Sequence, residues 1–155
     1  MENMDATSAV AATTSKWEQI AYCGKGWYWI LEELDQKLLK LDPNYKIIQV
    51  KEKFGGLRYY FETEATGVLR EIMYDCQEQA YVKASATCMD CGKGAYRGYE
   101  FNDSTVETRY DGWVNTTCTA CAEIRLLNRV KAEDNYANTT SGKDETDKDS
   151  SNSEV

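Results

Sequence analysis

The chain has 155 residues, and its 18 Lys and Arg against 26 Asp and Glu give a net charge of −8. It contains six Cys and no His. The absence of histidine excludes Ser–His–Asp and Cys–His catalytic sites, zinc fingers with mixed cysteine and histidine ligands, and zinc deaminases, because all of them need an imidazole. Any bound metal must therefore be held by thiolates or carboxylates, and the length suggests about one domain.

The two ends of the chain differ in composition from its middle. Residues 1–14 are small and polar, and residues 132–155 carry two Lys against seven acidic residues. Neither end can bury enough apolar surface to offset the entropy of ordering, so we predict that both are disordered. The first twenty residues lack the charged and apolar regions of a signal peptide, and no segment is apolar enough to span a membrane. We therefore expect a cytoplasmic protein with no membrane partner.

The first predicted element is a helix that follows Gly24-Lys25-Gly26. Apolar residues recur at helical spacing, and polar residues fill the other face. The apolar set is Trp27, Ile30, Leu31, Leu34, Leu38 and Leu41. We expect the helix to end at Asp42-Pro43, because the residue before a proline is driven out of the helical region.

Two predicted strands, residues 47–54 and 57–62, flank Gly55-Gly56, a pair typical of a two-residue hairpin turn. This register places Phe54 opposite Leu57 and Val50 opposite Phe61. Side chains alternate between the faces of a strand, so the hairpin should have one apolar and one polar face. The apolar face would hold Ile48, Val50, Phe54, Leu57, Tyr59 and Phe61, with Glu52 as an exception, and the polar face Gln49, Lys51, Lys53, Arg58, Tyr60 and Glu62.

A second helix is predicted from about Thr66 to Ala84. Its apolar stripe consists of Leu69, Ile72, Met73, Cys76 and Ala80. We expect this stripe and the first helix to pack on the apolar face of the hairpin. The sequence thus predicts an α+β domain over residues 15–85, with the order helix, hairpin, helix.

Two CxxC pairs follow, Cys88–Cys91 and Cys118–Cys121, separated by 26 residues. Paired CxxC spacing is typical of structural zinc, and a reducing compartment disfavours the alternatives, two disulfides or redox pairs. Four cysteine ligands leave no open position, so the ion should be structural. We predict a zinc ribbon with four cysteine ligands over residues 86–131, with strand-like segments at 99–101 and 113–115 and a short helix over 122–131.

Three segments carry a resemblance to known proteins: Cys23-Gly24-Lys25-Gly26-Trp27, the run from Ile48 to Tyr60 with its QVKEKFGGLR motif, and the CxxC pairs with Gly112-Trp113 before the second. From Trp17 to Val130 the chain resembles a family of small uncharacterised proteins of bacteriophages, prophages and bacteria. The resemblance implies a phage-encoded accessory protein with a C-terminal ribbon, acting in the host cytoplasm. It implies no activity. Family members often have a Cys–His pair where this chain has Cys118 and Cys121.

Three functional hypotheses follow. The first is a binding protein that docks a host or phage macromolecule, either protein or nucleic acid. The second is a single-stranded nucleic-acid binder through Lys51, Lys53, Arg58 and Tyr60, because cations beside an aromatic ring suit phosphate contact and base stacking. The third is an enzyme with a carboxylate such as Glu52 as general base. The chain lacks His and a paired-acid motif, so we expect no enzyme.

Several alternatives stay open at this point. The Lys51, Lys53, Arg58 and Tyr60 set could be an ordinary solvated strand face. If it is not the recognition surface, the ribbon loop around Arg97, Tyr99, Arg109 and Trp113 is the next candidate. Cys23 and Cys76 could form a redox pair or add ligands, but we expect them to pack in the core, where a free cysteine behaves as a small hydrophobe.

Overall fold

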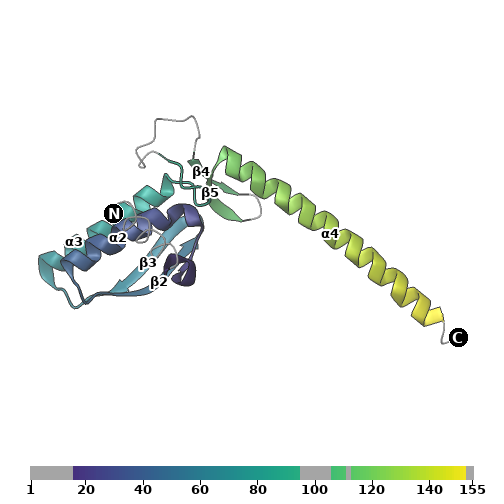
Figure 1. Cartoon of the computed structure of the whole chain (residues 1–155), viewed down its shortest axis with the longest axis horizontal. Helices are drawn as coiled ribbons and strands as arrows, with labels where there is room; N and C mark the ends of the chain where they lie inside the picture. Colours follow the sequence, from purple (N-terminus) through teal and green to yellow (C-terminus); the bar gives the residue numbers. More distant parts are fainter. Residues whose placement is uncertain (1–15, 95–105, 111–112, 153–155) are drawn as a thin grey trace, which may run out of the picture. The chain divides into compact units, whose positions relative to one another are not determined.

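A computed structural model describes residues 16–94, 106–110 and 113–152 (Figure 1). Residues 16–20 are helical. The following elements are β1 (Ala21–Tyr22), the 3-10 helix η1 (Lys25–Trp27), α2 (Tyr28–Leu41), β2 (Lys46–Lys53), β3 (Gly56–Glu62), α3 (Gly67–Ser85), β4 (Val106–Tyr110), β5 (Val114–Cys118) and α4 (Thr119–Asn152). Helices combined with small sheets confirm the α+β class. The predicted disorder of residues 1–14 lies outside the described residues.

Helix α2 confirms the first predicted helix and its end. The helix stops at Leu41, and the N–H of Asp42 still donates to the Leu38 carbonyl at 2.8 Å. Its apolar stripe forms the centre of the core: Ile30, Leu31, Leu34 and Leu38 are buried together with Trp27 of η1, and Leu41 is partly buried. The helical spacing in the sequence therefore identified the buried face correctly, since all these positions turn toward one side of the helix.

Strands β2 and β3 form the expected hairpin, but the predicted register is wrong. Lys53 pairs with Gly56 and Lys51 with Arg58, so the two turn residues are Phe54 and Gly55. Their φ angles are 54° and 79°, and a type I′ turn requires positive φ at both positions. The strands are shifted by two residues from the predicted pairing. Between Gln49 and Lys53 a shift of two keeps the side chains on their predicted faces, because side chains alternate with a period of two.

The predicted apolar face of the hairpin is correct in its middle and wrong at its ends. Val50, Leu57, Tyr59 and Phe61 are buried. Phe54 is exposed, because it lies in the turn rather than in the strand. Ile48 is exposed as well, because the register is irregular between Ile47 and Gln49 and its neighbour Ile47 packs against the core instead.

Strand β1 was not predicted. It runs parallel to β2, with Ala21 beside Val50 and Tyr22 beside Lys51, and completes a three-stranded sheet in the order β1-β2-β3. Ala21 packs against the core with Val50, whereas Tyr22 is exposed. Two residues are too few for a strand signal in the sequence.

Helix α3 packs against α2 and β3 (Figure 1). Met73, Ala80 and Ala84 are buried, and Cys76 is partly buried against the core. Two members of the predicted stripe are exposed, Leu69 and Ile72. They belong to the N-terminal part of the helix, whose buried residues begin at Met73.

A buried polar network lies within this core. Asp35 is 3% exposed, accepts a bond from the Tyr45 hydroxyl, and pairs with the Lys16 ammonium at 2.6 Å. The hydroxyls of Tyr45 and Tyr59 lie 2.7 Å apart. Burial, followed by the bond to Asp35, raises the pKa of Tyr45 well above its usual value, so this network keeps its hydroxyl protons across the ordinary pH range.

The chain divides into two compact units, Met1–Cys121 and Ala122–Val155. The predicted boundary at 85/86 is therefore not a division between compact units. Strands β4 and β5 are antiparallel, with Val106 opposite Cys118. The expected strand-like segment at 113–115 corresponds to β5, which runs on to Cys118, whereas the one at 99–101 lies outside the described residues.

Helix α4 continues to Asn152, well past Lys131, so the short helix predicted over 122–131 is wrong in its end. All side chains described from Leu126 to Thr139 are exposed. Without a buried face, a helix receives little stabilisation from tertiary packing. The disorder predicted for the tail at 132–155 stays a prediction. None of the described helices is long and apolar enough to cross a membrane.

Candidate metal centre

The structure brings Cys88, Cys91, Cys118 and Cys121 together. Their four sulfurs all lie within 4.8 Å of one another, and the Sγ atoms of Cys91 and Cys118 are 3.8 Å apart. Sulfurs about 2.3 Å from a tetrahedral ion would be roughly 3.8 Å apart. No disulfide joins them. The group therefore has the spacing of four ligands around one ion and could hold a metal.

The first pair lies in a tight loop closed by backbone hydrogen bonds. The Gly92 N–H donates to the Cys88 carbonyl at 2.9 Å, and the Cys88 N–H donates to the Lys93 carbonyl at 2.8 Å. Gly92 has a φ of 78°, which a glycine adopts without steric cost. The CxxCG pattern thus specifies the turn that brings Cys91 back beside Cys88.

Backbone amides stabilise charge on the buried Cys88 sulfur. Burial alone would raise the pKa of this thiol, but hydrogen bonds from the N–H groups of Cys91, Cys118 and Asp90 outweigh burial and lower it. The thiolate is the form that binds a metal. The loop therefore presents Cys88 in a form suited to coordination even though its side chain is removed from water.

The second pair spans the junction of a strand and a helix. Cys118 is the last residue of β5 and is buried, and Cys121 lies in the first turn of α4. The Met89 N–H donates to the Thr116 carbonyl at 2.9 Å and ties the first loop to β5. This backbone bond sets the distance between the two pairs, which the sequence separation alone does not determine.

The first loop also packs directly against η1, a contact that the sequence analysis missed. The Gly26 N–H donates to the Met89 carbonyl at 2.8 Å, and the buried Trp27 indole N–H donates to the Thr87 carbonyl at 2.8 Å. A Cβ on Gly24 would lie 2.0 Å from the Met89 oxygen. Only glycine permits this approach, which explains the glycine at this position of the Gly24-Lys25-Gly26 segment.

The hairpin turn packs against the strand pair of β4 and β5. The Thr116 hydroxyl donates to the Gly55 carbonyl at 2.6 Å. A Cβ on Gly55 would lie 2.9 Å from the Thr108 methyl group. The four-cysteine cluster is therefore held by the segment of helices and hairpin over residues 16–85, which belongs to the same compact unit. One contact lies at η1 and the other at the hairpin turn.

Glu52 has a structural role in this turn. Its Oε1 accepts a hydrogen bond from the Gly55 N–H at 2.6 Å. The side chain is only half-buried, so it is not an isolated acid within the apolar core. Its place on the otherwise apolar face follows from this bond, which satisfies a backbone donor in the turn.

The remaining two cysteines lie apart from the metal group. Cys23 and Cys76 are both partly buried and packed against the core, and neither belongs to the four-sulfur cluster. Burial, and then the nearby charge of Glu52, raises the pKa of Cys23 to about 12. Its thiol thus stays protonated near neutral pH. The structure agrees with core packing rather than with extra ligands.

The predicted recognition residues share the outer face of the sheet. Lys51 is directly opposite Arg58, Tyr60 is opposite Gln49, and Lys53 is opposite Gly56 next to the turn. Lys53 and Tyr60 are exposed, and Lys51 and Arg58 are half-buried. The Lys51 ammonium lies 5.9 Å from the Tyr60 ring centre, and the Arg58 guanidinium 5.8 Å from that of Tyr81. The corrected register therefore keeps the four residues together.

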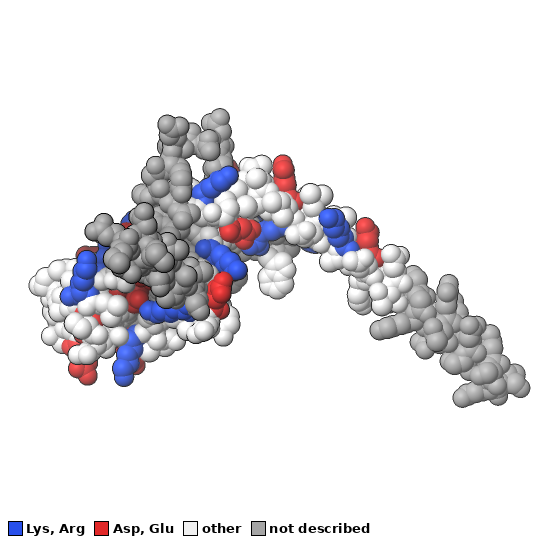
Figure 2. Space-filling view, viewed as in Figure 1, with Lys and Arg blue, Asp and Glu red and all other residues white. Residues whose placement is uncertain are grey.

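Charge is mixed on the face of the molecule that Figure 2 shows, where blue and red side chains are interspersed rather than separated into large fields. Many cations have acidic partners, such as Lys25 with Glu18 at 3.3 Å and Lys37 with Glu33 at 3.1 Å. Among the described residues, no carboxylate lies within ion-pair distance of Lys51, Lys53 or Arg58. The outer sheet face therefore carries cations that are not neutralised locally.

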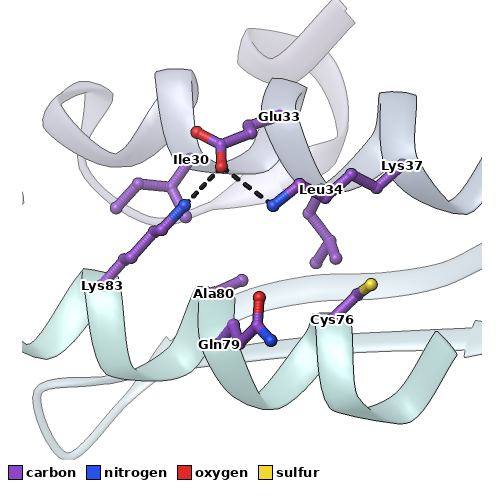
Figure 3. A pocket seen from close by; sticks show the side chains of 8 residues that line it. All are labelled: Ile30, Glu33, Leu34, Lys37, Cys76, Gln79, Ala80 and Lys83. Atoms are coloured by element: carbon purple, nitrogen blue, oxygen red, sulfur yellow. Dashed lines mark hydrogen bonds and ion pairs between the residues drawn. The ribbon is translucent and has the colours of Figure 1, made fainter. Parts of the chain in front are cut away.

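A shallow hollow lies between α2 and α3 (Figure 3). The Glu33 carboxylate bridges Lys83 of α3 and Lys37 of its own helix, and these bonds outweigh burial and lower the pKa of Glu33. Ile30, Leu34 and Ala80 line the hollow beneath this bridge. The arrangement joins two helices by an ion-pair cluster over apolar packing, which is a structural role.

The alternative recognition surface, the ribbon loop around Arg97, Tyr99, Arg109 and Trp113, is only partly covered by the described residues. Arg97 and Tyr99 lie outside the described residues. Arg109 donates from its Nε to the Thr117 carbonyl at 3.4 Å and pairs with Glu107 at 3.6 Å, so part of its function is to tie β4 to β5. Trp113 is 81% exposed beside this strand pair.

Comparisons with family models, with curated proteins and with solved structures found no match for this chain.

Proposed function

We propose that the protein binds one Zn²⁺ through Cys88, Cys91, Cys118 and Cys121, and that the ion is structural. The proposal rests on four sulfurs within 4.8 Å of one another, supplied by two CxxC pairs. Four thiolates suit tetrahedral zinc, and a full set of protein ligands leaves no position for a reacting group. Zinc would stabilise the junction between the ribbon, η1 and the hairpin turn.

We further propose that the protein acts by binding an anionic macromolecule and not by catalysis. The support is the outer sheet face, where Lys51, Lys53 and Arg58 lie together without local acidic partners among the described residues. Unneutralised cations on a rigid hairpin attract anionic partners over a Debye length of about 10 Å. The carboxylate considered as a general base, Glu52, is engaged with the hairpin turn. An accessory role in a phage-infected host cytoplasm remains a proposal that rests on the family resemblance alone.

Elemental analysis of the purified protein tests the zinc proposal. We expect one zinc per chain, and Cys91→Ser should reduce the zinc content strongly because three thiolates hold the ion less tightly. Cys76→Ser is the matched control, because this cysteine lies outside the cluster and its replacement should leave the zinc content unchanged. Wild-type protein without zinc, or equal losses in both variants, would contradict the proposal.

Charge reversal tests the binding proposal. Lys51→Glu with Arg58→Glu should abolish capture of the partner from host cells while leaving the zinc content intact. The matched control is Lys40→Glu with Arg70→Glu, which changes the net charge equally at two exposed cations on α2 and α3. If the first variant retained every partner of the wild type, the hairpin face would not be the binding surface.

A further inference from the structure

The structure adds a second tyrosine to the outer face of the sheet. Tyr22 of β1 pairs with Lys51 of β2, which pairs with Arg58 of β3, so the three residues form one row across the sheet. Tyr60 lies two residues along β3 in the next row, opposite Gln49. Two tyrosines therefore flank two cations on a single face.

Both tyrosine rings are accessible. Tyr22 is 74% exposed and Tyr60 is 44% exposed, whereas Tyr59, on the opposite face of β3, is 2% exposed. Neighbouring strands lie about 4.8 Å apart and residues on one face about 7 Å apart along a strand, which places the two tyrosine backbones roughly 12 Å apart. That separation lets each ring meet a different base.

We propose that this face binds single-stranded nucleic acid, with Tyr22 and Tyr60 stacking on bases and Lys51 and Arg58 contacting phosphates. The inference rests on the proposed binding function and names the ligand class. Aromatic rings that take the faces of bases, beside cations that follow the backbone, form the usual platform for single strands. In a duplex the base faces are covered by stacking, so the exposed rings would have no role there.

The chemistry of the face favours nucleic acid over an acidic protein surface. Tyrosines also occur in protein interfaces, but two rings that alternate with two cations match the alternation of bases and phosphates in a single strand. The net charge of −8 for the chain also disfavours tight non-specific binding by charge alone, because such binding needs a surplus of cations. Stacking supplies an attraction that does not depend on net charge.

The test is a titration of the zinc-loaded full chain with a fluorescent oligothymidine and an oligouridine of about 12 nucleotides. We expect Tyr22→Ala and Tyr60→Ala each to weaken binding by about 10-fold, and Tyr22→Phe and Tyr60→Phe to retain most of it, because phenylalanine keeps the stacking face. Lys51→Glu with Arg58→Glu should weaken binding further and reduce the slope of log affinity against log salt by about 1.4.

Two controls distinguish this inference from its alternatives. Tyr110→Ala removes an 80% exposed tyrosine from β4 of the ribbon and should leave affinity unchanged. Each variant is first shown to hold one zinc, so that loss of binding is not loss of fold. Wild-type affinity in Tyr22→Ala and Tyr60→Ala, or a loss only in Tyr110→Ala, would overturn the inference.

Polyglutamate as a second probe separates the two ligand classes. If the wild type ignored both oligonucleotides but bound polyglutamate through Lys51 and Arg58, the nucleic-acid inference would fail and the binding function would survive. If Lys51→Glu with Arg58→Glu changed the affinity for neither probe, both the nucleic-acid inference and the proposed binding function would fail. If oligonucleotide binding depends on Tyr22 and Tyr60, the result supports the nucleic-acid inference and the proposed binding function together.

Discussion

At the scale of single residues, Gly26 determines how closely the cysteine loop can approach η1. It donates its N–H to the Met89 carbonyl, and a Cβ there would lie 2.2 Å from the Cys88 oxygen and 2.5 Å from the Gly92 nitrogen. Both are backbone atoms of the loop that holds the first two cysteines. A side chain at Gly26 would therefore press on the loop that holds Cys88 and Cys91.

Gly26→Ala should lower the free energy of unfolding by about 3 kcal/mol and accelerate loss of the metal to a chelator, because overpacking against backbone forces the loop to shift. Urea denaturation and the rate of metal transfer measure the two effects. Gly67→Ala is the control: Gly67 has a φ of 61° but no atom within 4 Å of an added Cβ, so it should cost only about 1 kcal/mol of backbone strain. Equal effects in the two variants would show that the close approach is unimportant.

At the scale of elements, the hairpin shows how a turn selects its register. The sequence offers two overlapping candidates for the two-residue turn, Phe54-Gly55 and Gly55-Gly56, and the glycine pair suggested the later one. The earlier turn is adopted because it lets Glu52 accept the Gly55 N–H and lets the Gly55 carbonyl accept the Thr116 hydroxyl. These bonds offset the cost of placing Phe54 at a φ of 54°.

Phe54→Asn should raise the free energy of unfolding by about 0.5–1 kcal/mol, because asparagine tolerates positive φ better than phenylalanine and the lost ring is 73% exposed. Thermal or urea unfolding measures the change, with Tyr110→Asn as a control for removing an exposed aromatic ring from a strand. Under the Gly55-Gly56 turn, Phe54 would be a strand residue on the core face and the same substitution would destabilise. The sign of the effect therefore decides between the two registers.

At the scale of the whole molecule, the four-cysteine cluster and the segment of helices and hairpin over residues 16–85 belong to one compact unit. The first cysteine loop contacts η1, and β5 contacts the hairpin turn, so the ligands are linked to both η1 and the three-stranded sheet. Binding of a metal by the folded state stabilises that state, and ligands that must be thiolates make this stabilisation dependent on pH.

Removal of the metal should therefore destabilise the sheet as well as the ribbon. We expect a chelator, or Cys88→Ser, to lower the melting temperature by at least about 10 °C, since the free energy of structural zinc binding is commonly about 10–16 kcal/mol. Hydrogen exchange should show faster exchange in β2 and β3 as well as in β5. Protection of the hairpin that survived metal removal would mean that the two parts fold independently. Acidification should reproduce the chelator result, because protons compete with the metal for the thiolates.

The sequence by itself determined the features that depend on local pattern. Helical spacing identified the buried stripe of α2, alternation identified the two faces of the hairpin, and the CxxC spacing identified four cysteines that the structure brings within 4.8 Å. These are properties of neighbours along the chain, and the register shift of two residues left the faces of the hairpin unchanged in its middle, between Gln49 and Lys53.

Only the tertiary structure decided the contacts between distant segments. Gly26 meets Met89, Trp27 meets Thr87, and Gly55 meets Thr116, over separations of about sixty residues. Those contacts selected the hairpin turn and joined the ribbon to η1 and the sheet. The pairing of β1 with β2 placed Tyr22 beside Lys51. No local pattern encodes them, because the free energy of each depends on backbone atoms that become neighbours only when the whole unit has folded.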